Sequence, residues 1–290
     1  MTLKEKIKSN KFVVTSEIGP PKGIDVKELI EEAKLIKGRV DAVNVTDLQS
    51  AVMRLGSLAV SYLLKKEGIE PIYQLTCRDR NRLALQSDAL SAAALGIENI
   101  LVLTGDHPSR GDHPEAKPVY DLDSVQLIEA IKKLETGKDM AGKELKGTPK
   151  FCVGAVVNPG ANPIEPELIK FEKKIKAGVE FFQTQGVYDV ESFARFMEKV
   201  KGYNTCIIAG IILLKSANMA RYMNENVAGI SVPEDLIKEI EGAADTKAKA
   251  VEIAARTIKE LKGLARLGGI HIMSIGWNKL VPRILDAAGL

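Results

Sequence analysis

Residues 12–46 read FVVTSEIGPPKGIDVKELIEEAKLIKGRVDAVNVT, and this stretch decides the fold. It begins with a valine-rich run, continues through a segment with apolar residues at helical spacing, and ends in a second run of β-branched residues. The alternation recurs along the chain and predicts eight strands, at residues 12–17, 42–46, 71–76, 99–104, 151–157, 179–185, 205–212 and 269–275. Eight β-α units favour a closed barrel of parallel strands. We therefore predict an α/β protein with a single (β/α)8 TIM barrel that spans residues 1–290.

Length and composition agree with one such barrel, which commonly takes about 250 residues. The chain has 290 residues, of which 45% are hydrophobic and 27% are charged. Its net charge of +3 is too small to favour a nucleic-acid partner. The N-terminal segment MTLKEKIKSNKF has no apolar signal-peptide core, and no run of about 20 apolar residues is present to span a bilayer. We expect a cytoplasmic protein without a membrane segment.

The cysteines and histidines do not predict a metal site. Cys77, Cys152 and Cys206 lie far apart and form no CxxC pair, so we expect small buried side chains at Cys152 and Cys206. Cys77 follows a strand end and could be exposed. His107, His113 and His271 do not form a ligand pair at helical spacing.

Several predicted strands end in a polar residue, and the C-terminal strand ends form the active site of a barrel of this kind. Glu17 closes the first strand just before Gly19, Pro20 and Pro21. A carboxyl there is either half of an ion pair across the barrel mouth or a general acid in a largely apolar setting. Asp106 follows the fourth strand, where it either shapes a turn or contacts a ligand.

Neutral hydrogen-bonding side chains follow the same rim, and they suit a heterocycle with amide-like edges better than a metal. They are Gln74, Thr76, Gln185 and Ser274. Three lysines, Lys170, Lys173 and Lys174, lie within about one turn of a predicted helix. A solvated helix face is the ordinary interpretation of such lysines, and a clamp for the phosphates of a ligand is the alternative. No Gly-rich phosphate-binding fingerprint follows the first strand, which disfavours a Rossmann domain.

Short motifs in a fixed order carry a family resemblance. TSEIGPP, VNVTD, YQLTC, LVLTGDHP, KAGVEFFQTQ and VYDVESF resemble the motifs of the methylenetetrahydrofolate reductase family of flavoproteins. The resemblance implies a single FAD-binding catalytic domain that reduces 5,10-methylenetetrahydrofolate to 5-methyltetrahydrofolate, with hydride passing from a donor to FAD and then to folate. It implies a role in one-carbon metabolism, in methionine biosynthesis or the Wood–Ljungdahl pathway.

The resemblance also implies roles for individual residues. Glu17 matches the catalytic acid that protonates the folate bridge nitrogen. Asp106 matches an aspartate beside flavin and folate, and Gln185 matches a glutamine that contacts folate or nicotinamide. The positions that match FAD contacts are Thr46, Gln74, Thr104, Gly105, Asp106, Tyr120, Asp121, Glu167, Lys170, Lys173 and Lys174.

Some positions depart from the family pattern. Gln74 stands where many relatives have histidine, and Thr104 stands where many have arginine. The loop NPGANP differs from the family's His-Pro version, so that Asn158 or Asn162 is a candidate for the place of that histidine. We therefore expect rearranged flavin contacts.

Three alternatives stay open on the sequence. The first is a flavin-free barrel transferase that binds folate or another pterin. The second is a catalytic subunit that receives electrons from a partner subunit carrying iron-sulfur or zinc centres. The third is a non-catalytic scaffold in an electron-transfer assembly, for which an acid at the barrel mouth would serve no purpose. The electron donor (NADH, NADPH or another) and homo-oligomer formation are left open as well.

Overall fold

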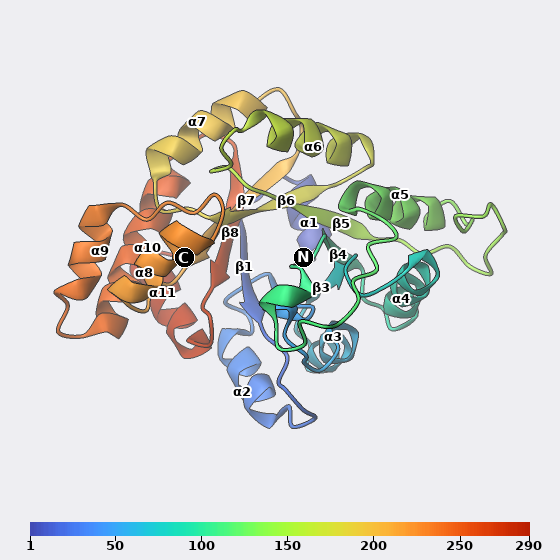
Figure 1. Cartoon of the computed structure of the whole chain (residues 1–290), viewed down its shortest axis with the longest axis horizontal. Coiled ribbons are helices and arrows are strands. Elements are labelled where there is room, and N and C mark those ends of the chain that lie inside the picture. The colour runs from blue at the N-terminus through green and yellow to red at the C-terminus, as the bar shows by residue number, and fades with distance from the viewer.

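The computed structural model describes all residues 1–290 and contains eight parallel strands closed into a barrel, with helices around it (Figure 1). Neighbouring strands in the chain are neighbours in the barrel, and β1 closes it against β8. The strands are β1 Val13–Ile18, β2 Ala42–Val45, β3 Pro71–Thr76, β4 Asn99–Leu103, β5 Cys152–Val157, β6 Phe181–Gly186, β7 Cys206–Ile212 and β8 Leu267–Met273. The predicted barrel is confirmed, and each predicted strand agrees with the observed one to within two residues.

Helices follow the strands and cover the outside of the barrel (Figure 1). They are α1 Leu3–Lys8, α2 Lys27–Ile36, α3 Ser57–Lys66, α4 Arg82–Ala94, α5 Ser124–Leu134, α6 Glu165–Lys176, α7 Val190–Val200, α8 Ala217–Asn226, α9 Glu234–Glu241, α10 Thr246–Lys262 and α11 Val281–Ala288. Each buries one face; in α7, for example, Phe193, Phe196, Met197 and Val200 point inward. The longest helix, α10, ends at Lys262, because the chain turns at Gly263 and enters β8 at Leu267.

The barrel interior is layered because alternate residues of each strand point inward. The layer nearest the N-terminal ends is apolar and consists of Val13, Ala42, Ile72, Leu101, Cys152, Phe181 and Ile208. Leu3 of α1 completes this layer and is fully buried, so the short first helix closes the bottom of the barrel. Above it lie Thr15, Asn44, Gln183 and His271, which are polar and buried. The interior side chains that could take part in a reaction therefore lie in the upper half of the barrel, toward the C-terminal strand ends.

Two loops at the C-terminal mouth are packed against one another. The loop after β2 contains the short 3-10 helix η1 Gln49–Ala51, and the long loop after β4 contains η2 Pro108–Arg110. Gly111 lies so close to the first loop that an added Cβ would sit 1.8 Å from the Ala51 carbonyl oxygen. Asp112 accepts a hydrogen bond of 3.0 Å from the Met53 amide and pairs with Lys22. Together these contacts shape one side of the mouth.

Three other features that the sequence analysis considered are Cys77, a metal site and a membrane segment. Cys77 is fully buried rather than exposed, because it lies against the outer face of the barrel, and burial raises its pKa to about 12. No group of three or more His, Cys, Asp or Glu side chains is arranged to bind a metal ion. No helix has both the length and the apolar composition needed to cross a bilayer.

Candidate active site

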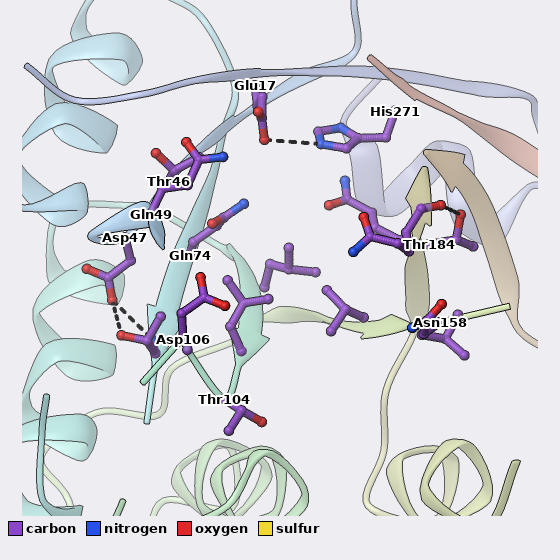
Figure 2. Close-up of a pocket in the computed structure, with 18 of the residues that line it drawn as sticks. Glu17, Thr46, Asp47, Gln49, Gln74, Thr104, Asp106, Asn158, Thr184 and His271 are labelled. Atoms are coloured by element: carbon purple, nitrogen blue, oxygen red, sulfur yellow. Dashed lines mark hydrogen bonds and ion pairs between the residues drawn. The ribbon is translucent and has the colours of Figure 1, made fainter. Parts of the chain in front are cut away.

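A cavity of about 490 Å³ opens at the C-terminal ends of the strands. Figure 2 shows Thr46, Gln74 and Asp106 on one side of it and Asn158 and Thr184 on the other. Ten of the predicted site residues line it, namely Glu17, Thr46, Gln74, Thr104, Gly105, Asp106, Glu167, Lys170, Lys174 and Gln185. These ten come from five strands or strand ends and from α6; with Val156 of β5 and His271 of β8, seven of the eight strands contribute to the lining.

Glu17 projects into the cavity from β1 and is 8% exposed. It faces the imidazole of His271 on β8, whose Nε2 lies 3.8 Å from the Glu17 Oε2 (Figure 2). No lysine or arginine pairs with Glu17, which separates it from Asp47, whose buried carboxylate pairs with Arg80 at 2.7 Å. If Glu17 forms an ion pair across the barrel mouth, its partner is therefore a protonated His271, and both interpretations of Glu17 stay open.

His271 is held by its neighbours within the buried polar layer of the barrel. Its Nδ1 lies 2.9 Å from the Thr15 hydroxyl, and that hydroxyl accepts a hydrogen bond of 3.3 Å from the Gln183 amide. Gln183 and Asn44 hold one another through two amide contacts of 2.6 and 3.1 Å. Because every member of this layer has a partner, the imidazole is fixed in orientation beneath Glu17.

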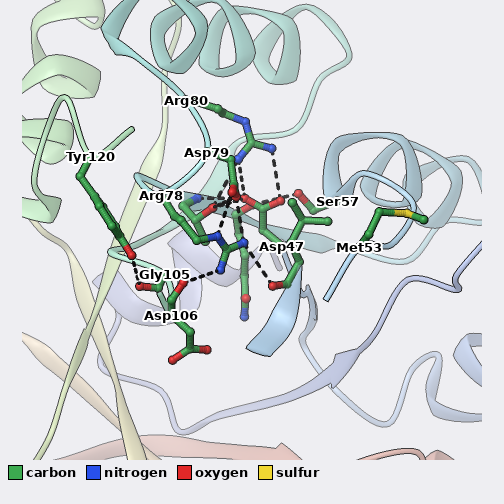
Figure 3. A network of polar contacts seen from close by, with 12 residues as sticks. Asp47, Met53, Ser57, Arg78, Asp79, Arg80, Gly105, Asp106 and Tyr120 are labelled. Carbon is green, nitrogen blue, oxygen red and sulfur yellow. Dashed lines mark hydrogen bonds and ion pairs between the residues drawn. The ribbon is translucent and has the colours of Figure 1, made fainter. Parts of the chain in front are cut away.

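Asp106 occupies a different environment from Glu17. It is exposed at the mouth and lines the cavity on the side of β2 to β4 (Figure 2). The preceding Gly105 has a φ of 88° and turns the chain over β3. The Tyr120 hydroxyl donates a hydrogen bond of 3.1 Å to the Gly105 carbonyl, and Arg78 donates one of 3.1 Å to the Asp106 carbonyl (Figure 3). The backbone around Asp106 is thus held on both sides.

Two of the three predicted lysines face the cavity. Lys170 and Lys174 lie four residues apart on α6 and share its inner face, whereas Lys173 is exposed. Lys174 is 3% exposed and donates a hydrogen bond of 2.6 Å to the Val156 carbonyl. Burial lowers the pKa of Lys174 to about 8; Glu167 acts in the opposite direction, and Lys170 lowers it further. The cavity therefore has a cationic wall along α6.

Tyr120, Asp121 and Lys173 do not line the cavity. Tyr120 reaches it only through the Gly105 carbonyl. Asp121 accepts hydrogen bonds from the guanidinium and amide of Arg82, at 2.8 to 2.9 Å.

Of the neutral rim residues, Thr76 lines the cavity, and Ser274 lies buried beside Asn278. Asn158 lines it too, while its side-chain amide donates to the Ala228 carbonyl. Asn162 is exposed outside the lining.

The sequence did not point to several residues that line the cavity. They are Asp47, Leu48, Gln49, Arg78, Gln183, Thr184, His271 and Met273. Strand periodicity could have identified some of them, because Gln183 precedes Gln185 by two residues and His271 precedes Met273 by two. No comparable signal distinguishes Arg78 from Arg80 and Arg82 nearby in the chain.

Comparison with known proteins gives one consistent result. The family model described as methylenetetrahydrofolate reductase matches residues 2–289. Methylenetetrahydrofolate reductase 2 of Schizosaccharomyces pombe is 27% identical over 74% of this chain and 35% of its own length. The 5,10-methylenetetrahydrofolate reductase of Pectobacterium carotovorum is 28% identical over 69% of this chain and 63% of its own length. The chain thus spans less than two thirds of these relatives.

Solved structures support the fold alone. An uncharacterized protein from Clostridium thermocellum, described as binding two copies of 5-methyl-5,6,7,8-tetrahydrofolic acid, has a TM-score of 0.69 at 19% identity. That match covers 99% of this chain and 98% of the other. A 2,3-dimethylmalate lyase has a TM-score of 0.53 at 10% identity and covers 99% of this chain and 87% of its own.

Proposed function

Because the chain belongs to the methylenetetrahydrofolate reductase family, we propose that it reduces 5,10-methylenetetrahydrofolate to 5-methyltetrahydrofolate. The observation that carries the proposal is the pair of carboxyl groups, Glu17 and Asp106, that line one cavity in contrasting environments. Folate binding by the Clostridium thermocellum protein supports a barrel of this shape as a folate site. The reaction requires one proton and one hydride, delivered to a folate held in a fixed orientation.

Glu17 is the proposed general acid. It donates a proton to the folate bridge nitrogen, and the bond between that nitrogen and the methylene carbon breaks with its electron pair going to the nitrogen. The methylene carbon is left as an iminium on the other nitrogen, ready to accept a hydride. Glu17 suits this step because no lysine or arginine pairs with its carboxyl, while His271 lies 3.8 Å away to orient it.

Asp106 is the proposed electrostatic partner of the iminium. Its exposed carboxyl lies at the mouth, where a carboxylate remains well solvated, and its negative charge favours a cation that develops nearby. Two carboxyl groups with separate roles need separate environments, and the buried position of Glu17 provides the contrast. Gln74 and Gln185 supply amide groups for the edges of the pterin or of a nicotinamide.

The residues present fit FAD as the cofactor. The Thr46 hydroxyl oxygen is buried at the cavity and has no hydrogen-bond partner within the chain, which is expected of a group that a ligand satisfies. Lys170 and Lys174 provide cations for a pyrophosphate, with Glu167 beside them, and Gln74, Thr104 and Gly105 line the opposite wall. When bound, FAD would supply the hydride.

A flavin-free folate-binding barrel is the second candidate. It is favoured by the description of the Clostridium thermocellum protein, which names two folate molecules, and by Gln74 and Thr104 in place of the residues common in the family. The two candidates differ in colour. Purified protein with flavin absorbance bands supports the first, and colourless protein that binds 5-methyltetrahydrofolate in calorimetry supports the second.

The test of the proposed role of Glu17 is Glu17→Gln, measured in two half-reactions by anaerobic stopped-flow absorbance. NADH, NADPH and a reduced viologen serve as donors in parallel, so that a chain dependent on a partner subunit still receives electrons. We expect flavin reduction at the wild-type rate and folate reduction slowed about 1,000-fold, within the range for a lost general acid.

Glu198→Gln is the matched control, because Glu198 is an exposed carboxyl on α7 that pairs only with Lys201. It should leave both half-reactions unchanged. Equal losses in the two half-reactions of Glu17→Gln would refute the assigned role.

A further inference from the structure

Arg78 is a buried arginine at the cavity that none of the proposed steps uses. It follows β3 by two residues, lines the cavity, and is 2% exposed. Its Nε and Nη2 donate to the two carboxylate oxygens of Asp79, both at 2.8 Å. This bidentate pair fixes the plane of the guanidinium and leaves its remaining donors aimed at the neighbouring loops (Figure 3).

Those donors reach the backbone on both sides of β3. Nη1 donates to the Asp106 carbonyl at 3.1 Å, and Nη2 donates to the Leu48 carbonyl at 3.2 Å. Leu48 belongs to the loop after β2, and Asp106 belongs to the loop after β4. A single side chain therefore connects two loops that carry cavity-lining residues and that are separated by a strand.

Both connected segments have a backbone that needs external support. Leu48, Ser50 and Ala51 have φ values of 48°, 57° and 57°, in the left-handed region that these residue types seldom adopt. Such conformations persist where neighbouring contacts hold them. At Gly105, where φ is 88°, an added Cβ would lie 3.0 Å from the Arg78 Cβ. The chain can pass over Arg78 on its way to Asp106 because this position is glycine.

We infer that Arg78 is a positioning residue, which holds the Asp106 carboxylate and the Leu48–Gln49 edge of the cavity at a fixed separation. This inference rests on the role proposed for Asp106. Arg78 acts through the backbone of the two loops rather than on the folate itself. Because a planar guanidinium makes all four contacts at once, a lysine in its place keeps the charge but cannot reproduce them.

The test is a double-mutant cycle with Arg78→Lys, Asp106→Asn and the combined variant, measured as kcat and KM for folate reduction. A displacement of about 1 Å at a reacting group can cost on the order of 100-fold, so we expect Arg78→Lys to lower kcat by about that factor. In the Asp106→Asn background the same change should cost less than about threefold, because the group that Arg78 positions is already gone. Losses that multiply would overturn the inference.

Controls separate positioning from general damage. Arg221→Lys removes a comparable bidentate pair, with Glu241 on the far side of the barrel, and should leave kcat unchanged. Asp79→Asn is the milder second variant, which releases the guanidinium without removing it, and serves if Arg78→Lys does not fold. We expect a several-fold loss of kcat from it, which should again disappear in the Asp106→Asn background.

A crystal structure of a variant tests the positioning role of Arg78 independently of the proposed reaction. Wild-type protein that reduces no folate with any donor would refute the proposed reaction, and the structure of Arg78→Lys or Asp79→Asn would then decide the positioning role. Displaced Leu48 and Asp106 carbonyls would support it, and carbonyls in their wild-type positions would overturn it.

Discussion

Lys174 should make the stability of the folded chain depend on pH in an unusual direction. Its ammonium group is buried against the wall of the cavity, and burial lowers its pKa from 10.5 to about 8. Below pH 8 the folded chain holds a buried charge that the unfolded chain keeps in water. The folded state binds fewer protons than the unfolded state between about pH 8 and 10.5, so the free energy of unfolding should rise with pH across this window.

The size of the effect follows from the two pKa values. A pKa of about 8 in the folded chain, against 10.5 in the unfolded chain, corresponds to about 3 kcal/mol between the two ends of the window. Other lysines and tyrosines titrate in the same range, so the wild-type curve alone does not isolate Lys174. Lys174→Met removes this titration and leaves an unbranched apolar side chain of similar length.

The measurement is urea unfolding followed by circular dichroism, from pH 7 to pH 10.5, for the wild type and for Lys174→Met. The wild type should gain about 3 kcal/mol relative to the variant over this range. Lys176→Met is the control, because Lys176 is exposed on the same helix, and its curve should run parallel to the wild type. A constant difference between the wild type and Lys174→Met at every pH would refute the reasoning.

The same experiment with FAD tests whether α6 forms an anion site. A bound pyrophosphate near Lys170 and Lys174 favours the charged ammonium, so saturating FAD should reduce the gain with pH. An unchanged gain in FAD-saturated protein would separate the lysines from the flavin phosphates. That outcome would not affect the conclusion about the buried charge of Lys174, which depends on the comparison of the wild type with Lys174→Met.

Two further predictions concern the bottom and the mouth of the barrel. Leu3→Ala should lower the free energy of unfolding by about 3 kcal/mol, because Leu3 fills the apolar layer that closes the barrel. The kcat should not change. A loss below about 1 kcal/mol in urea unfolding would show that α1 is dispensable. Asp112→Asn should speed hydrogen exchange at the Met53 amide, because Asp112 holds that amide and pairs with Lys22. Lys22 lowers the pKa of Asp112 well below 3.8, so in the wild type the hydrogen bond from the Met53 amide to Asp112 should persist above about pH 4 and fail only in stronger acid. Hydrogen exchange at Met53 that does not respond to Asp112→Asn would contradict this account.

Much of the fold could be predicted from the sequence because the barrel repeats one simple pattern. Each strand is a short, largely apolar run, several are followed by a polar residue, and inward-facing residues recur every second position. Val13, Thr15 and Glu17 show this in one strand, since they form the bottom, middle and top of the same interior column. Helical spacing could also have separated Lys170 and Lys174 from Lys173, because residues four apart share a face.

The remainder depended on contacts between distant parts of the chain. The first helix contains a single buried residue, Leu3, and no periodicity in LKEKIK indicates that this helix closes the bottom of the barrel. His271 lies 256 residues from Thr15 and meets it only because β8 closes against β1. Arg78 is buried and Arg82 is exposed although both follow β3, because the loops that surround Arg78 come from other strands.

The two carboxyl groups of the cavity differ in how they are held, and this predicts how variants will behave. Glu17 is part of β1, and the buried layer of Thr15, Gln183 and His271 fixes its surroundings. Asp106 lies on a loop and depends on the carbonyl contacts made by Arg78 and Tyr120. Changes in the barrel layer should therefore impair proton delivery while folate affinity is kept. Changes among the loop contacts should alter folate affinity and the hydride step together, because the same loops line the cavity proposed to hold both folate and flavin.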